Sequence, residues 1–176
     1  MASRLRDIDR RRLRASLLQH LEDYPRQLDV LRYGFEQFDL PDFERAYVSR
    51  DPEVYMPVQA IERGFGRIQN YTADMAVAGA RLAELRVRTN RDSEPRAQPA
   101  FEALRDANAI TATLCRGLIA SQKSRSLLEH DYVRIPGSDV YAAVAKLVDI
   151  APRFLAGFAT WVEAFLLGPD LGRPAR

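Results

Sequence analysis

The chain has 176 residues, 47% of them hydrophobic, with 26 basic residues against 24 acidic ones and a formal net charge of +2. This size suits one domain with one core, so we expect a single domain over residues 1–176, with a basic N-terminal extension of about residues 1–13 and a frayed C-terminal tail of about residues 168–176. The nearly balanced charge excludes nucleic-acid binding over the whole surface, so any RNA contact must be local.

Several other classes of protein are also excluded by the composition. No apolar stretch is long enough to span a membrane and arginines open the chain, so we expect a cytoplasmic protein without a signal peptide. The single cysteine, Cys115, lies in an apolar run and is predicted to be buried and inert. Because no cluster of cysteines or histidines has metal-ligand spacing, we expect no metal and no other cofactor.

The N-terminal half of the chain shows helical periodicity in two segments. Residues 4–38 carry leucines and phenylalanines at helical spacing and predict a helix that Pro25 kinks or divides. Residues 40–52 contain prolines, aspartates and a serine, which predicts a connection. The longest helix is predicted from about residue 52 to residue 88, and Gly64 and Gly66 inside it would allow close helix packing.

The C-terminal half begins with a polar stretch that contains two prolines and predicts a loop, after which three more helices follow. The loop is expected at residues 89–99 and the helices at about residues 99–107, 110–130 and 138–167. Ser138 or Asp139 is the predicted N-cap of the last helix, which is expected to bend at Pro152.

Aromatic residues recur at helical spacing in the last predicted helix and indicate a core or dimer contact. They are Phe154, Phe158, Trp161 and Phe165. Nothing in the chain alternates like a β-strand. The predicted fold is therefore all-α, an antiparallel bundle of about five helices, and this fold does not by itself give a function.

The segment that carries the most chemical information is Arg-x4-His-x-Tyr, formed by Arg125, His130 and Tyr132 at the end of a predicted helix. An accidental match around one of the two histidines has a chance of about one per cent. On the residues alone, the alternative is structural: the charge of His130 would interact favourably with the dipole at the C-terminal end of the helix, and Arg125 would pair with Glu129 one turn on. Residues five apart lie about 140° apart around a helix, so convergence needs a frayed turn, a long arginine side chain or a two-fold interface.

Several segments, in the same order and spacing, resemble the HepT family of HEPN domains over roughly residues 14–167. The matching segments are Ala60-Ile61-Glu62-Arg63, Phe101-Glu102-Ala103-Leu104 with Ala109-Ile110, the Arg-x4-His-x-Tyr motif, Tyr132-Val133-Arg134-Ile135, and Asp139-Val140-Tyr141. The resemblance implies a HEPN-like bundle that acts as the ribonuclease toxin of a toxin–antitoxin pair, cleaving tRNA or mRNA without a metal. It also implies a homodimer, with higher hetero-oligomers possible, whose composite cleft lies on the two-fold axis.

RNA supplies its own nucleophile, the 2′-hydroxyl, so a ribonuclease needs a proton carrier near neutral pH and a fixed cation for the phosphorane. The resemblance assigns the first role to His130 and the second to Arg125, with Ser126 as an auxiliary polar residue. It further implies that Tyr132 receives AMP from an MntA-like nucleotidyltransferase antitoxin. The modification would place phosphate charge beside the two catalytic residues.

Other features leave alternatives open. Ser126 and Glu129 stand where the family commonly has asparagine and a small apolar residue, so the bundle could be catalytically degenerate and serve as a binding partner or substrate of a nucleotidyltransferase. The N-terminal arginines Arg6, Arg10 and Arg14 align at one-turn spacing, for which a solvated helix face is favoured over an RNA contact. His20 has no motif neighbours and is interpreted as an ordinary histidine, and the chain lacks the Glu-x-x-His pairs of ferritin-type metal bundles.

Overall fold

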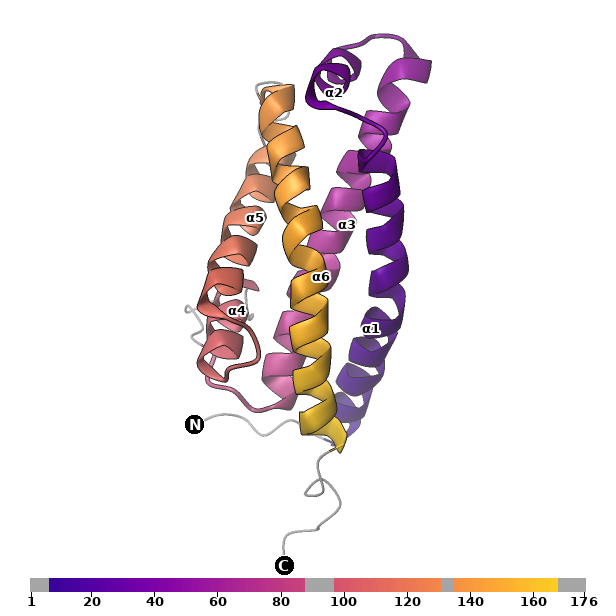
Figure 1. The fold of residues 1–176 in the computed structure, drawn as a ribbon. Helices are drawn as coiled ribbons and strands as arrows, with labels where there is room; N and C mark the ends of the chain where they lie inside the picture. Colours follow the sequence, from indigo (N-terminus) through magenta and orange to yellow (C-terminus); the bar gives the residue numbers. More distant parts are fainter. Residues whose placement is uncertain (1–6, 88–96, 131–134, 168–176) are drawn as a thin grey trace, which may run out of the picture.

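The computed structural model describes residues 7–87, 97–130 and 135–167, with the backbone alone for residues 126–130 and 165–167. Its helices are α1 (Asp7–Phe35), α2 (Leu40–Tyr47), α3 (Pro52–Leu82), α4 (Ala97–Asp106), α5 (Ala112–His130) and α6 (Gly137–Leu167) (Figure 1). The predicted all-α bundle is confirmed for the described residues, which form six helices in place of about five.

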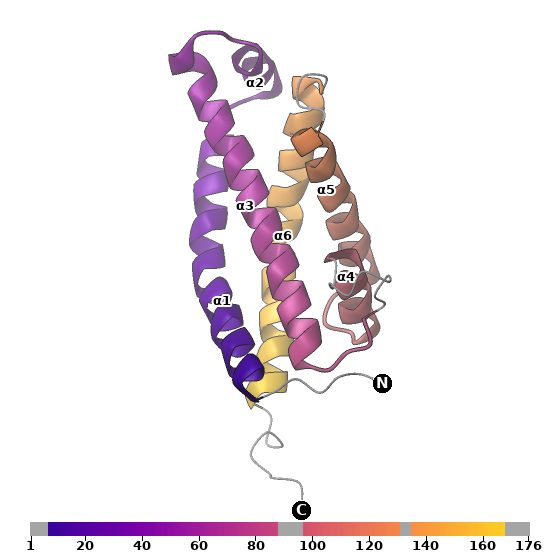
Figure 2. The same ribbon diagram turned by 180° about the vertical axis from the view of Figure 1, so that it is seen from behind.

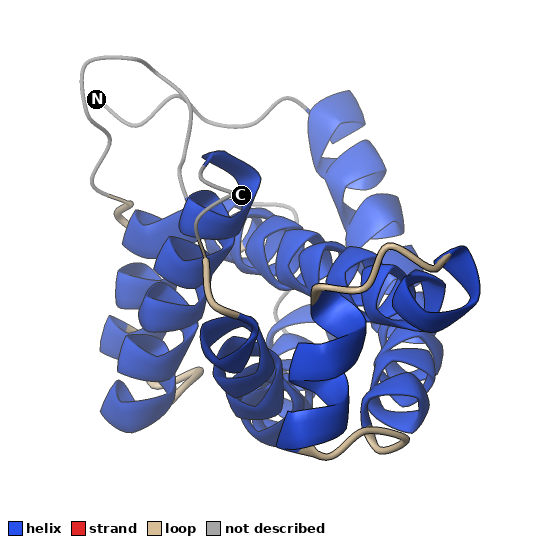
Figure 3. Cartoon of the chain, turned by 90° about the horizontal axis from the view of Figure 1, so that it is seen from above, coloured by secondary structure: helices blue, strands red, loops and turns tan. Residues whose placement is uncertain are grey.

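Four long helices, α1, α3, α5 and α6, run antiparallel along the bundle, as the views from the two sides show (Figures 1 and 2). The α1–α3 pair makes the most extensive contact, and α6 packs against α1, α2, α3 and α5. The view along the bundle shows helices joined by loops and no strand in the described part (Figure 3). The end of α5, the start of α6, the short α2 and the start of α3 lie at one end, which we call the motif end.

One hydrophobic core runs through the bundle. Its largest fully buried side chains include Tyr24, Phe43, Phe65, Phe101, Phe154 and Phe158. Phe154 and Phe158 stack with ring centroids 5.1 Å apart, which confirms the core interpretation for this part of the aromatic stripe. Trp161 packs partly buried against the core, and the side chain of Phe165 lies outside the description. Cys115 is 1% exposed, as predicted, and burial raises the pKa of its thiol.

The prediction of a plain connection over residues 40–52 is wrong, because α2 lies within it. Asp39 caps this helix by accepting a hydrogen bond from the Asp42 amide at 2.8 Å, and Pro41 occupies the first turn, where its missing N–H is not needed. Turn residues thus begin a helix here. The fully buried Phe43 fixes α2 onto the core.

The bounds of the long helices decide two other expectations. Pro25 lies inside the continuous α1, so it does not divide that helix. Pro152 lies inside α6, which continues through it as the prediction of a single helix requires. The prediction for α3 is wrong at its end, because this helix ends at Leu82 rather than near residue 88. Glu84 adopts a left-handed backbone with φ of 53°, and this conformation terminates the helix.

The glycines of α3 have different surroundings. A Cβ at Gly64 would lie 3.2 Å from Leu31 of α1, which confirms the predicted close packing there. A Cβ at Gly79 would lie 2.7 Å from the Phe158 ring, so glycine is needed for the close approach of α6. At Gly66 a Cβ would meet nothing within 4 Å. The predicted packing role is therefore wrong for Gly66, which faces open space.

Candidate functional site

Arg125 lies half-buried on α5, where its Nη1 donates a hydrogen bond to Oδ1 of Asn70 on α3. The two residues are 55 positions apart in the chain, and Asn70 itself is exposed. An amide oxygen is a neutral acceptor, so this bond orients the guanidinium without neutralising its charge. Sequence reasoning missed Asn70, because no local pattern marks it.

A buried polar contact fixes the register of α3 against α5 next to this pair. Nε2 of Gln69 donates to the backbone carbonyl of Ser121 at 2.8 Å and to its Oγ at 2.7 Å. Gln122 returns a bond from its Nε2 to the Gln69 carbonyl at 3.0 Å. Gln69 and Ser121 are 1% and 4% exposed, and buried polar groups tolerate little displacement from their partners. The contact therefore sets where Arg125 lies relative to Asn70.

The other predicted site residues are described less fully. Ser126 and His130 belong to the backbone of α5, but their side chains, and the whole of Tyr132, lie outside the described residues. Because α5 is helical through His130, its Cα lies about 140° around the helix from that of Arg125. A single α5 does not turn both residues to one face, and their convergence at a two-fold axis stays a prediction.

The two described members of the predicted row of N-terminal arginines have different surroundings. Arg10 donates hydrogen bonds to Oε1 of Glu84 at 2.9 Å and to the Leu82 carbonyl at 3.3 Å. It thereby satisfies the C-terminal end of α3, where a cation also suits the helix dipole. Arg14 is exposed, and Arg6 lies outside the described residues. A structural contact of α1 with α3 accounts for Arg10.

His20 makes an interhelical contact of an ordinary kind. Its ring centroid lies 5.0 Å from that of Tyr71, and its Nε2 lies 3.7 Å from a carboxylate oxygen of Asp74. Among the residues that the structure describes, no group of three or more potential ligands could hold a metal ion. Within the same described ranges, no helix combines the length and the hydrophobicity of a membrane span.

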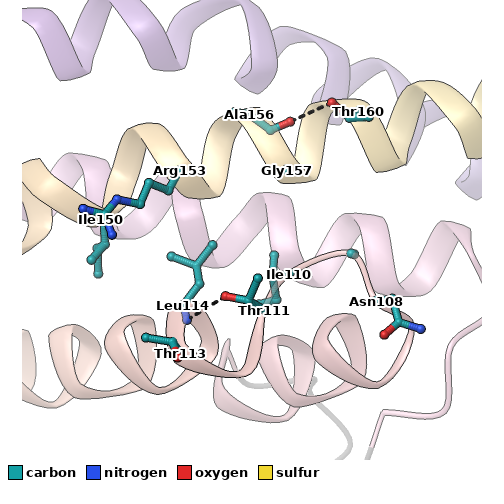
Figure 4. A pocket seen from close by; sticks show the side chains of 11 residues that line it. Asn108, Ile110, Thr111, Thr113, Leu114, Ile150, Arg153, Ala156, Gly157 and Thr160 are labelled. Atoms are coloured by element: carbon teal, nitrogen blue, oxygen red, sulfur yellow. Dashed lines mark hydrogen bonds between the residues drawn. The ribbon is translucent and has the colours of Figure 1, made fainter.

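A pocket of about 750 Å³ lies far from the motif end, between the start of α5 and α6 (Figure 4). Ile110, Leu114 and Ile150 give it an apolar wall, and Arg153 at its edge pairs with Asp149 at 2.5 Å. Two of its threonines bond to nearby helix backbone. None of the predicted site residues lines it, and its polar groups do not converge.

A smaller cavity, of about 270 Å³, lies between α2 and α3 at the motif end. It is lined by Tyr47, Ser49, Tyr55, Val58, Gln59 and Glu62. The Tyr47 hydroxyl is buried and makes no hydrogen bond. Burial and, to a smaller degree, the Glu62 carboxylate raise the pKa of Tyr47. Sequence reasoning missed this cluster, because it requires α2, which was interpreted as a connection.

Comparison of the chain with protein-family models, with curated proteins and with solved structures finds no match. The function must therefore be argued from the geometry around Arg125 and from the motif in the sequence.

Proposed function

We propose that this protein is a metal-independent endoribonuclease toxin that cleaves RNA, such as tRNA or mRNA. The observation that carries the proposal is the hydrogen bond from Arg125 to Asn70, which holds the guanidinium in place before any substrate binds. A preorganised cation of this kind stabilises the developing phosphorane charge without reorganisation. The resemblance to HepT proteins adds His130 as proton carrier and Ser126 as auxiliary polar residue.

In the proposed reaction the 2′-hydroxyl attacks the adjacent phosphorus and loses its proton to a base, while the 5′-oxygen leaves with a proton from an acid. His130 serves in this proton transfer, and Arg125 contacts the non-bridging phosphate oxygens. The products are a 2′,3′-cyclic phosphate and a 5′-hydroxyl. Because residues five apart on α5 do not share a face, Arg125 would act with His130 of the partner subunit across a two-fold axis.

Cleavage of tRNA by the purified chain in EDTA tests the proposal. We expect cyclic-phosphate ends from the parent, none from Arg125→Ala or His130→Ala, and unchanged cleavage from Arg116→Ala, since Arg116 is an exposed arginine of the same helix. Cleavage that stops in EDTA and returns with magnesium would contradict metal independence. No cleavage under any condition would favour the alternative, a degenerate HEPN-like bundle that binds, or is modified by, a nucleotidyltransferase.

The composite arrangement has a test of its own. Arg125→Ala and His130→Ala chains, each inactive, are unfolded together and refolded as a mixture. If the site combines residues of two subunits, half of the dimers are mixed and each has one intact site, so about a quarter of the parent activity returns. If both residues act within one subunit, the mixture stays inactive.

We propose that Tyr132 is the control point, modified with AMP by an MntA-like nucleotidyltransferase antitoxin. A phosphodiester attached two residues from His130 would occupy the position of the RNA phosphate near Arg125 and exclude the substrate. Co-expression should add mass in AMP increments to the parent and none to Tyr132→Phe. Equal silencing of both chains without added mass would indicate control by binding alone.

A further inference from the structure

The cavity between α2 and α3 has no part in the cleavage step proposed above. Its volume of about 270 Å³ is several times the roughly 30 Å³ that a water occupies in the liquid, so it has room for a larger group. Its lining offers three hydroxyls, an amide and a carboxylate beside two tyrosine rings. The buried Tyr47 hydroxyl has no hydrogen-bond partner there, and an unsatisfied buried group is uncommon enough to need an explanation.

We propose that this cavity binds a guanine base of the RNA substrate, an inference that rests on the proposed ribonuclease function. A carboxylate pairs best with two N–H groups side by side, and guanine alone among the four RNA bases presents them, at N1 and N2. Guanine O6, next to N1, accepts a hydrogen bond, and the Tyr47 hydroxyl near the Glu62 carboxylate supplies a donor. The rings of Tyr47 and Tyr55 provide aromatic surface against the base.

The mixture of donors and acceptors favours a base over a cationic side chain of a protein partner. A guanidinium or ammonium group carries donors alone, so it could not itself accept a hydrogen bond from the Tyr47 hydroxyl as guanine O6 can. The carboxylate of Glu62 can accept several hydrogen bonds at once, so an existing partner leaves capacity for the base.

The position of the cavity suits a strand that also reaches Arg125. Glu62, Gly66 and Asn70 follow at four-residue spacing along one side of α3. The eight helical steps from Glu62 to Asn70 span about 12 Å. A stacked strand rises roughly 3.4 Å per nucleotide and an extended strand rises more, so this length corresponds to about two to four nucleotides. Between them, Gly66 leaves open space above the helix. Arg63, exposed and seven residues before Asn70, adds a second cation for the backbone.

Cleavage of short RNAs that differ in a single base tests the inference. We expect the parent to cleave the guanine RNA at least about tenfold faster than its adenine counterpart, with inosine, which lacks the N2 amine, between them. Glu62→Gln should abolish the preference for the guanine RNA, because the amide lacks the carboxylate that accepts from both N1 and N2. Glu163→Gln, an exposed carboxylate of α6, should retain the preference. A parent without base preference, or a Glu62→Gln chain that keeps it, would overturn the inference.

Binding of 2′-deoxy versions of these RNAs, which cannot be cleaved, separates the two proposals. Preferential binding of the guanine strand without any cleavage of RNA would support the guanine pocket and overturn the proposed ribonuclease function. Cleavage of RNA together with binding that shows no base preference would support the ribonuclease function and overturn the guanine pocket. Tyr47→Phe, which keeps the ring, is expected to weaken guanine-strand binding several-fold while its thermal unfolding stays that of the parent or higher. If Glu62→Gln altered only neutralisation by the antitoxin, the cavity would be a protein-binding site and the inference would be wrong.

Discussion

The hydrogen bond between Tyr24 of α1 and Thr72 of α3 predicts an asymmetric effect of removing either partner. The Thr72 hydroxyl donates its one proton to the Ile68 carbonyl at 2.8 Å. The Tyr24 hydroxyl, 2.8 Å from Thr72 Oγ1, must therefore be the donor in the bond between them. Both side chains are buried, at 0% and 1% exposure, so no solvent replaces a lost partner.

The two substitutions leave different groups behind. Tyr24→Phe removes the donor, and the Thr72 hydroxyl keeps its bond to Ile68, so the free energy of unfolding should fall by about 1 kcal/mol. Thr72→Val leaves the phenol O–H without an acceptor in the core, at a cost of about 1–3 kcal/mol, although the side chain hardly changes in size. In the double variant neither group remains, and the loss should be smaller than the sum by about 1–2 kcal/mol.

Urea unfolding of the parent, the two single variants and the double variant measures these effects. In thermal unfolding, each kcal/mol corresponds to a shift of about 2–4 °C in the midpoint for a chain of this size. Burial raises the pKa of Tyr24 far above its ordinary range. In the unfolded chain Tyr24 ionises near pH 10, whereas in the folded chain it stays protonated to higher pH. The contribution of Tyr24 to the free energy of unfolding is therefore complete below about pH 10 and is lost as the pH rises further. Tyr24→Phe should remove that loss. Additive effects, or a smaller cost for Thr72→Val, would refute the assignment of the donor.

Three further outcomes follow from single contacts. Asn70→Ala should lower kcat/KM for RNA about tenfold by releasing the Arg125 guanidinium, and Asn70→Asp should lower it further by neutralising the charge; an aspartate variant as active as the parent would contradict this. Gly79→Ala should destabilise the fold by about 1–3 kcal/mol in urea unfolding, because its Cβ would lie 2.7 Å from a ring of α6. Gly66→Ala should stabilise the fold by about 0.5–1 kcal/mol, because a Cβ there meets no neighbour and alanine favours the helix. Equal effects of the two substitutions would contradict the packing argument. Cys115 should resist iodoacetamide in the native chain and react fully in urea, as mass spectrometry would show, and rapid native alkylation would disprove its burial.

Local signals predicted some elements correctly and others wrongly. The start of α5 was predictable, because the Thr111 hydroxyl accepts the Leu114 amide at 3.2 Å, a contact within one turn. The connection predicted over residues 40–52 failed, because Asp39 and Pro41 suit a turn and a helix start equally. The burial of Phe43 decides between them, and burial is a property of the whole fold.

The candidate site was predictable only for its part on α5. Arg125 belongs to a motif of fixed spacing, but Asn70 meets it across two helices whose register is fixed by Gln69 and Ser121. Hydrophobic periodicity indicates which side of a helix is buried and leaves this register undetermined. The cavity around Tyr47 was hidden for a different reason. Tyr47 belongs to α2 and Ser49 to the turn after it, within the segment that was predicted to be a plain connection.

The proposed guanine pocket has a consequence for control by AMP. Adenine presents an acceptor, N1, beside its N6 amine, so it matches the Glu62 carboxylate poorly. If Tyr132 receives AMP as proposed, the adenine would not inhibit cleavage by filling the pocket. The inhibition would come from the phosphate, in the position proposed for it near Arg125. The base pocket and the phosphate position then become separable. The Glu62→Gln chain should lose guanine preference but should still be inhibited completely by AMP modification, because the AMP phosphate that excludes the RNA phosphate is unchanged. A Glu62→Gln chain that carries AMP on Tyr132 and still cleaves RNA would contradict this and show that the adenine does occupy the pocket.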